Sequence, residues 1–156
     1  MDDAEFLDHF LGMMNNQPNR FHPLVWINGE PEIGEGTYIG GFSLVNAKGA
    51  RVEIGARCDI ASFVAINVAD SHRYAIGLDD APTRRDIVIG DEVFIGTQCA
   101  VLGGAIIGHN SVIAAGTIVR AGMIPPFSLV SGSPMIVRPG YYAEAHATRS
   151  RPPEPR

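Results

Sequence analysis

The sequence has few of the features that suit a secreted or membrane-bound protein. Only two of its 156 residues are cysteines, Cys58 and Cys99, and neither belongs to a CxxC pair. Two cysteines are too few for a disulfide framework, which excludes a small disulfide-stapled scaffold. No apolar run approaches the roughly 20 residues that a transmembrane helix needs. The segment MDDAEFLDHF, residues 1–10, lacks the basic start of a signal peptide, and we therefore expect a cytoplasmic protein with no membrane partner.

Positive charge is also scarce. The chain has 12 Lys and Arg residues against 17 Asp and Glu residues, which gives a net charge of −5. A nucleic-acid-binding protein needs a basic field to neutralise phosphates, so the charge balance argues against nucleic acid as a partner. A local group of arginines can still hold an anionic small molecule.

The sequence does contain a period of six residues. About thirteen units open with Ile or Val, and the register slips near residues 50–53. The openings are Ile27, Ile33, Ile39, Val45, Ile54, Ile60, Ile66, Ile89, Ile95, Val101, Ile107, Ile113 and Val119. The second position is mostly Gly or Ala, and the fifth is small or moderate in size. A short strand and a tight turn in every unit would point the first and fifth residues inward, so three units predict one triangular coil. The fold class that we expect is an all-β parallel β-helix of stacked coils.

Three segments interrupt or flank the repeat. Phe6, Leu7, Phe10, Leu11 and Met14 recur at helical spacing, so we expect residues 1–23 to include a short amphipathic helix packed on the coils. Residues 68–88 lack the repeat and predict a loop extruded from the coil domain, residues 24–124. From Pro125 the chain is expected to leave the repeat, and residues 125–156 form a C-terminal extension whose Pro- and Arg-rich end is expected to be disordered.

Cys58 and Cys99 both fall at the fifth position of a unit. We therefore expect them to be buried as small apolar residues, because reactive cysteines lie in polar, accessible surroundings.

The stretch IVIGDEVFIGTQCAVLGGAIIGHNSVIAAGTIVRAGMIPPFSLVSGSPMIVR resembles the hexapeptide-repeat acyltransferases. Within them it looks most like the small sugar O- and N-acetyltransferases, which include maltose and galactoside acetyltransferases and enzymes of polysaccharide biosynthesis. The resemblance covers residues 27–138. It implies that the β-helix is left-handed, that the chain forms a homotrimer, and that acetyl-CoA lies along the groove between neighbouring β-helices.

His72 is the candidate catalytic residue. The next aliphatic residue after Ile66 is due at position 72, where the sequence has a histidine at the start of the predicted loop. An imidazole is suited to proton transfer near neutral pH, and the resemblance places the catalytic histidine of the family here. Asp70 or a backbone carbonyl could set its tautomer. The other interpretation is a histidine that begins a loop and caps a strand end.

Candidate residues for the acceptor lie near this loop. The resemblance implies that an asparagine upstream of the histidine helps to hold the acceptor or the thioester, which suggests Asn46, with Asn67 as a weaker rival. Either could equally be a polar turn residue. Tyr74 lies in the loop with Arg73, Arg84 and Arg85, a group that could meet the diphosphate of a sugar nucleotide or could be ordinary surface charge.

For the cofactor, the resemblance implies a wall of small residues along the pantetheine chain. Small residues are also what the corners of a coil require. The residues that match this wall are Gly96, Thr97, Gly103, Ala114 and Ala115. Arg120 and Arg138 are the candidates for the phosphates, since a guanidinium group binds phosphate in a fork; a solvated surface arginine is the alternative for each.

The predicted function is acetyl transfer from acetyl-CoA to a hydroxyl or amino group of a sugar or sugar nucleotide. Two alternatives remain. The γ-class carbonic anhydrases share the fold but need three histidines, and Ala114 stands at the third position after His72 and His109. The other alternative is a β-helix subunit without catalytic activity. No metal site is predicted.

Overall fold

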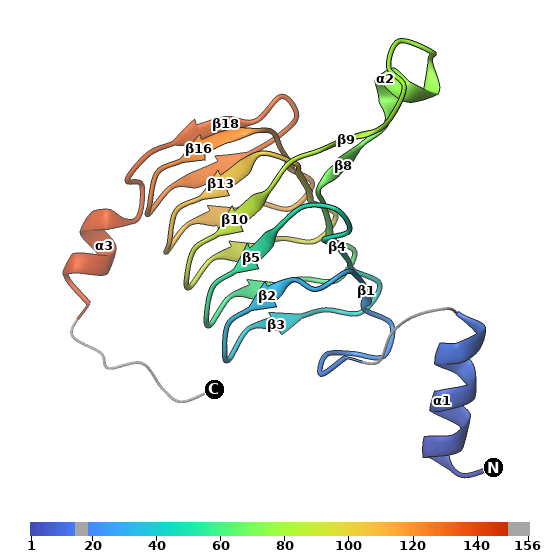
Figure 1. Ribbon diagram of the computed structural model, residues 1–156. Helices are drawn as coiled ribbons and strands as arrows, with labels where there is room; N and C mark the ends of the chain where they lie inside the picture. Colours follow the sequence, from blue (N-terminus) through green and yellow to red (C-terminus); the bar gives the residue numbers. More distant parts are fainter. Residues whose placement is uncertain (15–18, 150–156) are drawn as a thin grey trace.

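The computed structural model describes residues 1–14 and 19–149, and most of these form a coil of three sheets whose strands are parallel except for the last, β18, which pairs antiparallel with β17 (Figure 1). Sheet one follows the order β1-β4-β7-β12-β15, sheet two the order β16-β13-β10-β5-β2, and sheet three the order β18-β17-β14-β11-β6-β3. Sheet one contains β1 (Trp26–Asn28), β4 (Leu44–Asn46), β7 (Ala65–Asn67), β12 (Ala100–Leu102) and β15 (Ile118–Val119). Sheet two contains β2 (Glu32–Ile33), β5 (Val52–Ile54), β10 (Ile87–Ile89), β13 (Ala105–Ile107) and β16 (Gly122–Ile124). Sheet three contains β3 (Tyr38–Ile39), β6 (Asp59–Ile60), β11 (Phe94–Ile95), β14 (Val112–Ile113), β17 (Leu129–Ser131) and β18 (Ile136–Arg138). The parallel β-helix that the six-residue period predicts is confirmed.

Successive coils stack in the register that the period predicts. Ile39 pairs with Ile60, and Ile95 pairs with both Ile60 and Ile113. These openings are fully buried, and the small fifth-position residues are buried with them, including both cysteines. Burial raises the pKa of the Cys58 and Cys99 thiols, which is the environment expected for inert packing residues.

Three corners join the sheets. The first corner leads from sheet one to sheet two, the second from sheet two to sheet three, and the third from sheet three back to sheet one. The third corner consists of residues 40–43, 61–64, 96–99 and 114–117. Coils approach closely there: a Cβ on Gly96 would lie 2.5 Å from the backbone nitrogen of Ala115. This contact explains why the second position of a unit is small.

The coil continues further than the sequence predicts. Ile124 takes the place in sheet two next to Ile107, and Val130 pairs with Ile113 in sheet three. Both residues are buried. The prediction that the chain leaves the repeat at Pro125 is therefore wrong. The unit that opens at Val119 has five residues instead of six, because the next inward aliphatic residue is Ile124. A count in fixed steps of six therefore misses the last units.

The N-terminal helix α1 (Asp3–Met13) forms as predicted and begins with a capping box between Asp2 and Glu5. It contains no buried residue, and Phe6 is 58% exposed. Figure 1 shows the helix beside the coil rather than on it. The expectation that α1 packs on the coils is thus wrong for this chain, and Phe6 instead stacks on Phe10 of the same helix.

The C-terminal extension contains one helix that the sequence does not predict, α3 (Ala143–Ala147). His146 of this helix packs against the Phe127 ring at 5.1 Å. The disorder predicted for the end of the chain concerns mainly residues 150–156, which lie outside the described residues. Among the described helices, none is long and apolar enough to cross a membrane.

Candidate functional site

The extruded loop is the largest departure from the coil. It leaves sheet one after Asn67, and its two arms, β8 (Ala69–Asp70) and β9 (Thr83–Arg84), pair antiparallel. Its tip carries α2 (His72–Ala75), and Figure 1 shows this hairpin projecting from the body of the coil. Arg73 and Asp79 tie the tip together, with nitrogen–oxygen distances of 2.9 and 3.1 Å.

The coil resumes without a gap behind this loop. Ile89 pairs with Ile54 in sheet two and is the buried residue that the period demands after Ile66. Arg85 N donates to Val68 O at 3.1 Å, which closes the base of the loop. His72 is therefore an insertion and takes no place in the core, and its side chain is 69% exposed.

His72 is held by Asp70. The distance from Asp70 Oδ1 to His72 Nδ1 is 2.5 Å, and His72 N also donates to Asp70 Oδ1 at 3.2 Å. The hydrogen bonds from the His72 side chain and backbone lower the pKa of Asp70, so this carboxylate stays ionised. An ionised carboxylate at Nδ1 keeps the proton on that nitrogen and leaves Nε2 as the basic atom. Of the two orienting groups considered from the sequence, the structure has the carboxylate.

Asn46 and Asn67 form one ladder at the root of the loop. They are register partners on β4 and β7, and Asn46 Nδ2 donates to Asn67 Oδ1 at 2.9 Å. The same Oδ1 accepts from Ala69 N at 3.0 Å, while Lys48 N donates to Asn46 Oδ1 at 3.1 Å. These contacts set the orientation of the Asn67 amide and turn its Nδ2 donor away from both partners. From the sequence, Asn46 and Asn67 are alternative candidates for holding the acceptor, whereas in the fold they are hydrogen-bonded to each other.

Tyr74 lies on α2 and is 52% exposed. The arginines of the loop do not gather around it. Arg73 is bound to Asp79, and Arg84 Nε donates to Lys48 O at 2.8 Å, which ties β9 to the neighbouring coil. Arg85 acts electrostatically on Asp70. Arg73 and Arg84 thus brace the loop.

The residues predicted to contact the cofactor, with the two arginines included, lie in three places. Gly96 and Thr97 share the third corner with Ala114 and Ala115, where Gly116 N donates to Thr97 O at 2.9 Å. Thr97 also uses its hydroxyl to bond the preceding coil.

The remaining candidates lie elsewhere on the coil. Gly103 lies at the first corner under the loop, where an added Cβ would meet Val68 O at 2.6 Å. Arg120 follows β15 on the same corner, and Arg138 ends β18 on sheet three, next to Leu129. Both arginines are exposed. The loop with His72 and Gly103 therefore share the first corner of the triangular coil, whereas the other four small residues lie at the third corner.

The other histidines lie away from the loop. His109 is exposed at the second corner, where it meets the edge of the Phe127 ring at 5.0 Å and Asn110 Oδ1 at 2.7 Å. Asn110 in turn lies 3.3 Å from His146 Nε2. His72 and His109 are thus on different corners. In the part of the chain that the structure describes, no group of three His, Cys, Asp or Glu side chains could hold a metal ion.

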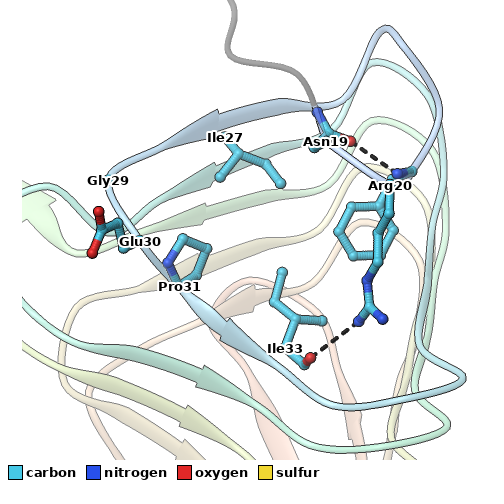
Figure 2. A pocket seen from close by; sticks show the side chains of 8 residues that line it. Asn19, Arg20, Ile27, Gly29, Glu30, Pro31 and Ile33 are labelled. Carbon is cyan, nitrogen blue, oxygen red and sulfur yellow. Dashed lines mark hydrogen bonds between the residues drawn. The ribbon is translucent and has the colours of Figure 1, made fainter.

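A cavity of about 270 Å³ lies at the N-terminal end of the coil (Figure 2). Ile27, Pro31 and Ile33 form part of its wall, and Arg20 closes the opposite side by donating to Ile33 O at 3.0 Å. None of the residues that line it is a predicted site residue. It is the open end of the first coil, which the segment around Arg20 caps.

Comparison with known proteins identifies the repeat. Residues 86–121 match the family described as bacterial transferase hexapeptide (six repeats). This stretch is a bacterial transferase hexapeptide repeat. The chain is 28% identical over 125 residues to a 2,3,4,5-tetrahydropyridine-2,6-dicarboxylate N-succinyltransferase of Xylella fastidiosa, a match that covers 71% of this chain and 41% of the relative. This chain thus spans about two fifths of the length of that relative.

Solved structures share the hexapeptide-repeat fold. A maltose O-acetyltransferase from Clostridium difficile matches with a TM-score of 0.59 and 21% identity, and the match covers 88% of each chain. A hexapeptide-repeat acetyltransferase from Vibrio cholerae, solved with acetyl coenzyme A, matches with a TM-score of 0.54 and 24% identity over 88% of this chain and 76% of the other. At these identities the likeness establishes the fold.

Proposed function

We propose that the protein is an acyltransferase that moves an acetyl group from acetyl-CoA to a hydroxyl or amino group of a sugar or sugar nucleotide. The observation that carries this proposal is the Asp70–His72 pair on the extruded loop of a hexapeptide coil. A carboxylate that holds Nδ1 leaves Nε2 free to act as a general base, which is the group that acyl transfer to an alcohol or amine requires. The maltose acetyltransferase and acetyl-CoA-bound relatives support the choice of sugar and cofactor.

The reaction is a direct transfer. The acceptor oxygen or nitrogen attacks the thioester carbonyl while His72 Nε2 takes the proton of the acceptor. The tetrahedral intermediate collapses, the carbon–sulfur bond breaks, and the proton passes from His72 to the sulfur of coenzyme A. Cys58 and Cys99 are buried, so neither thiol is placed to form an acyl-enzyme intermediate.

The active site is proposed to lie between two copies of a homotrimer. His72 projects from one corner of the coil, whereas Gly96, Thr97, Ala114 and Ala115 line another corner. A rigid coil cannot bring two of its own corners together, so the loop of one copy would face the wall of the next. The cofactor would run along this wall, with its phosphates toward Arg120 and Arg138 and with Gly103 at the loop base.

The acceptor would lie along the loop, between Asn67 at its root and His72 on α2. We assign Asn67 Nδ2 as a hydrogen-bond donor to the acceptor or to the developing oxyanion, with Asn46 holding the Asn67 amide in place. Tyr74 would cover the acceptor from the loop tip. We also place the reaction in the cytoplasm, where two free buried cysteines remain reduced.

The test is a thiol-release assay with acetyl-CoA against simple sugars and amino-sugar nucleotides. We expect turnover with at least one acceptor class and loss of turnover in His72→Ala, with the oligomeric state unchanged. Retention of activity in this variant would exclude the proposed base. Absence of turnover and of acetyl-CoA binding in the native protein would favour a β-helix subunit without catalytic activity.

A further inference from the structure

Two exposed phenylalanines stack on the third corner of the coil. Phe42 and Phe63 lie 5.1 Å apart between ring centroids, with an interplanar angle of 6°. They are 61% and 56% exposed, although large apolar side chains are usually withdrawn from water. Nothing so far assigned to the site uses this pair.

The turn itself does not require aromatic residues. Phe42 and Phe63 have φ angles of 64° and 60°, in the left-handed region where a bulky side chain is disfavoured. Gln98 and Gly116 occupy the same place in the following coils, with φ angles of 58° and 73°. A polar residue or a glycine therefore fills the position equally well, and the two aromatic rings need another explanation.

The pair continues the surface that the proposed function assigns to the cofactor. Gly96 and Thr97 follow β11 at the third corner. One coil nearer the N-terminal end, the same corner contains Phe63, and one coil further it contains Phe42. Contact between these coils is direct, because Thr97 Oγ1 donates to Ser62 O at 2.7 Å. The aromatic pair and the small-residue wall are thus one continuous strip.

The order of residues along the coil axis gives the strip a direction. Arg120 and Arg138, assigned to the phosphates, belong to the C-terminal end of the coil, and Ala114 and Ala115 lie between them and Thr97. The loop with His72 leaves after β7, between the level of Phe63 and the level of Gly96 and Thr97 along the coil axis. A cofactor with its phosphates at the C-terminal end therefore brings its thioester to the level of His72 and directs its acyl group toward Phe63.

We infer that Phe42 and Phe63 form an acyl subsite beyond the acetyl position, so that the protein, besides using the acetyl-CoA of the proposed function, binds a donor with a longer acyl chain, such as butyryl, more tightly. This inference rests on the proposed function, because it places the acyl group by the proposed course of the cofactor. An acetyl methyl group is too small to cover two stacked rings on coils about 4.8 Å apart, whereas a longer chain removes both rings from water.

Binding of acyl-CoA tests this directly, since it needs no acceptor. Each methylene that is fully buried strengthens binding by about fourfold, so we expect the native protein to bind butyryl-CoA about tenfold more tightly than acetyl-CoA in calorimetry. The double variant Phe42→Gln, Phe63→Gln copies the residue that the next coil has at position 98. It should lose this preference and bind acetyl-CoA within about twofold of the native protein. Met123→Gln, which removes a 72% exposed apolar side chain from sheet two, should keep the preference.

Three outcomes would overturn the inference. Equal affinities of the native protein for the two donors would show that it does not distinguish acyl chains by length. An unchanged preference in the double variant would place the acyl group elsewhere. Dissociation of the oligomer in the double variant, measured by light scattering, would make the pair a contact between copies. If the native protein binds neither donor, the proposed function fails as well, whereas binding of acetyl-CoA without a preference leaves that function standing.

Discussion

Asp70 Oδ1 lies 2.5 Å from His72 Nδ1, on a hairpin that the coil extrudes between Asn67 and Ile87. The pair is exposed, β8 and β9 of the hairpin pair with each other, and Arg84 Nε ties the hairpin to the neighbouring coil by donating to Lys48 O at 2.8 Å. A histidine held in one tautomer by the last residue of β8, where α2 begins at the tip of the hairpin, is an oriented base.

Replacing Asp70 by Asn removes the charge that holds the His72 tautomer. We expect kcat/KM for acyl transfer to fall on the order of 10²-fold, while acetyl-CoA binding stays unchanged. Steady-state kinetics at pH 7 and calorimetry measure the two effects. Asp80→Asn removes the same charge from the same loop and should leave both values unchanged. Equal losses in the two variants would indicate a general effect of loop charge.

Asn67→Asp tests the donor role of the amide. The new carboxylate keeps an oxygen acceptor for Ala69 N and Asn46 Nδ2 but removes the donor assigned to the acceptor or oxyanion. We expect kcat/KM to fall by about 10²-fold with the melting temperature nearly unchanged. Asn46→Ala should act through the same group, so its effect and that of Asn67→Asp should not be additive. Additive effects would mean that the two asparagines act independently.

Complementation tests whether the site is shared between copies. His72→Ala removes the base, and Ala115→Trp blocks the third corner, so each variant alone should be inactive. In trimers formed by co-expression of the two, about a quarter of the sites would combine an intact loop with an intact wall, and activity should return to about that level. Failure to recover activity in mixed trimers would place the complete site within one chain.

The buried cysteines should be unreactive in the folded protein. Burial raises the pKa of both Cys58 and Cys99, so little thiolate is present near neutral pH. We expect an aromatic disulfide reagent to modify both residues only at the rate of unfolding, and quickly in urea. Fast labelling without denaturant would contradict the packing of the third and second corners.

The ion pair between Glu92 and Arg57 predicts a pH-dependent contribution to stability. The hydrogen bond from Arg57, followed by that from Asn110, lowers the pKa of Glu92 in the folded state. Its stabilisation is therefore fully present above the pKa of the unfolded chain and is lost as the pH falls through the folded value. Because both side chains are partly exposed, Glu92→Gln should cost only about 0.5 kcal/mol at pH 7 in urea titrations, and nothing at strongly acidic pH.

The control for this experiment is Glu35→Gln, an exposed glutamate at the same corner. It should change stability little at either pH. A loss in Glu92→Gln that persists at acidic pH would mean that packing, rather than charge, carries the effect.

Much of the coil can be predicted from the sequence, because the pattern of inward-pointing residues is set within each six-residue unit. Each unit places its own first and fifth residues inward, so the buried positions from Ile27 to Val119 can be predicted without knowing what they pack against. The rule fails where the spacing changes. Ile124 and Val130 continue the core after a unit of five residues, and only their pairing with Ile107 and Ile113 reveals them.

The candidate site is divided in the same way. The interruption of the period marks His72 in the sequence alone, since an insertion disturbs a local pattern wherever it occurs. Only the tertiary structure selects Asp70 as its partner and joins Asn46 to Asn67, because stacking of the coils brings residues 21 positions apart into register. Only the fold shows that the loop and the third corner lie apart. Each turn of a triangular coil lies at one of three corners, and which corner depends on how many strands precede the turn. The sequence alone determines the period and the inserted loop, whereas the stacking of coils determines which inserted and corner residues meet.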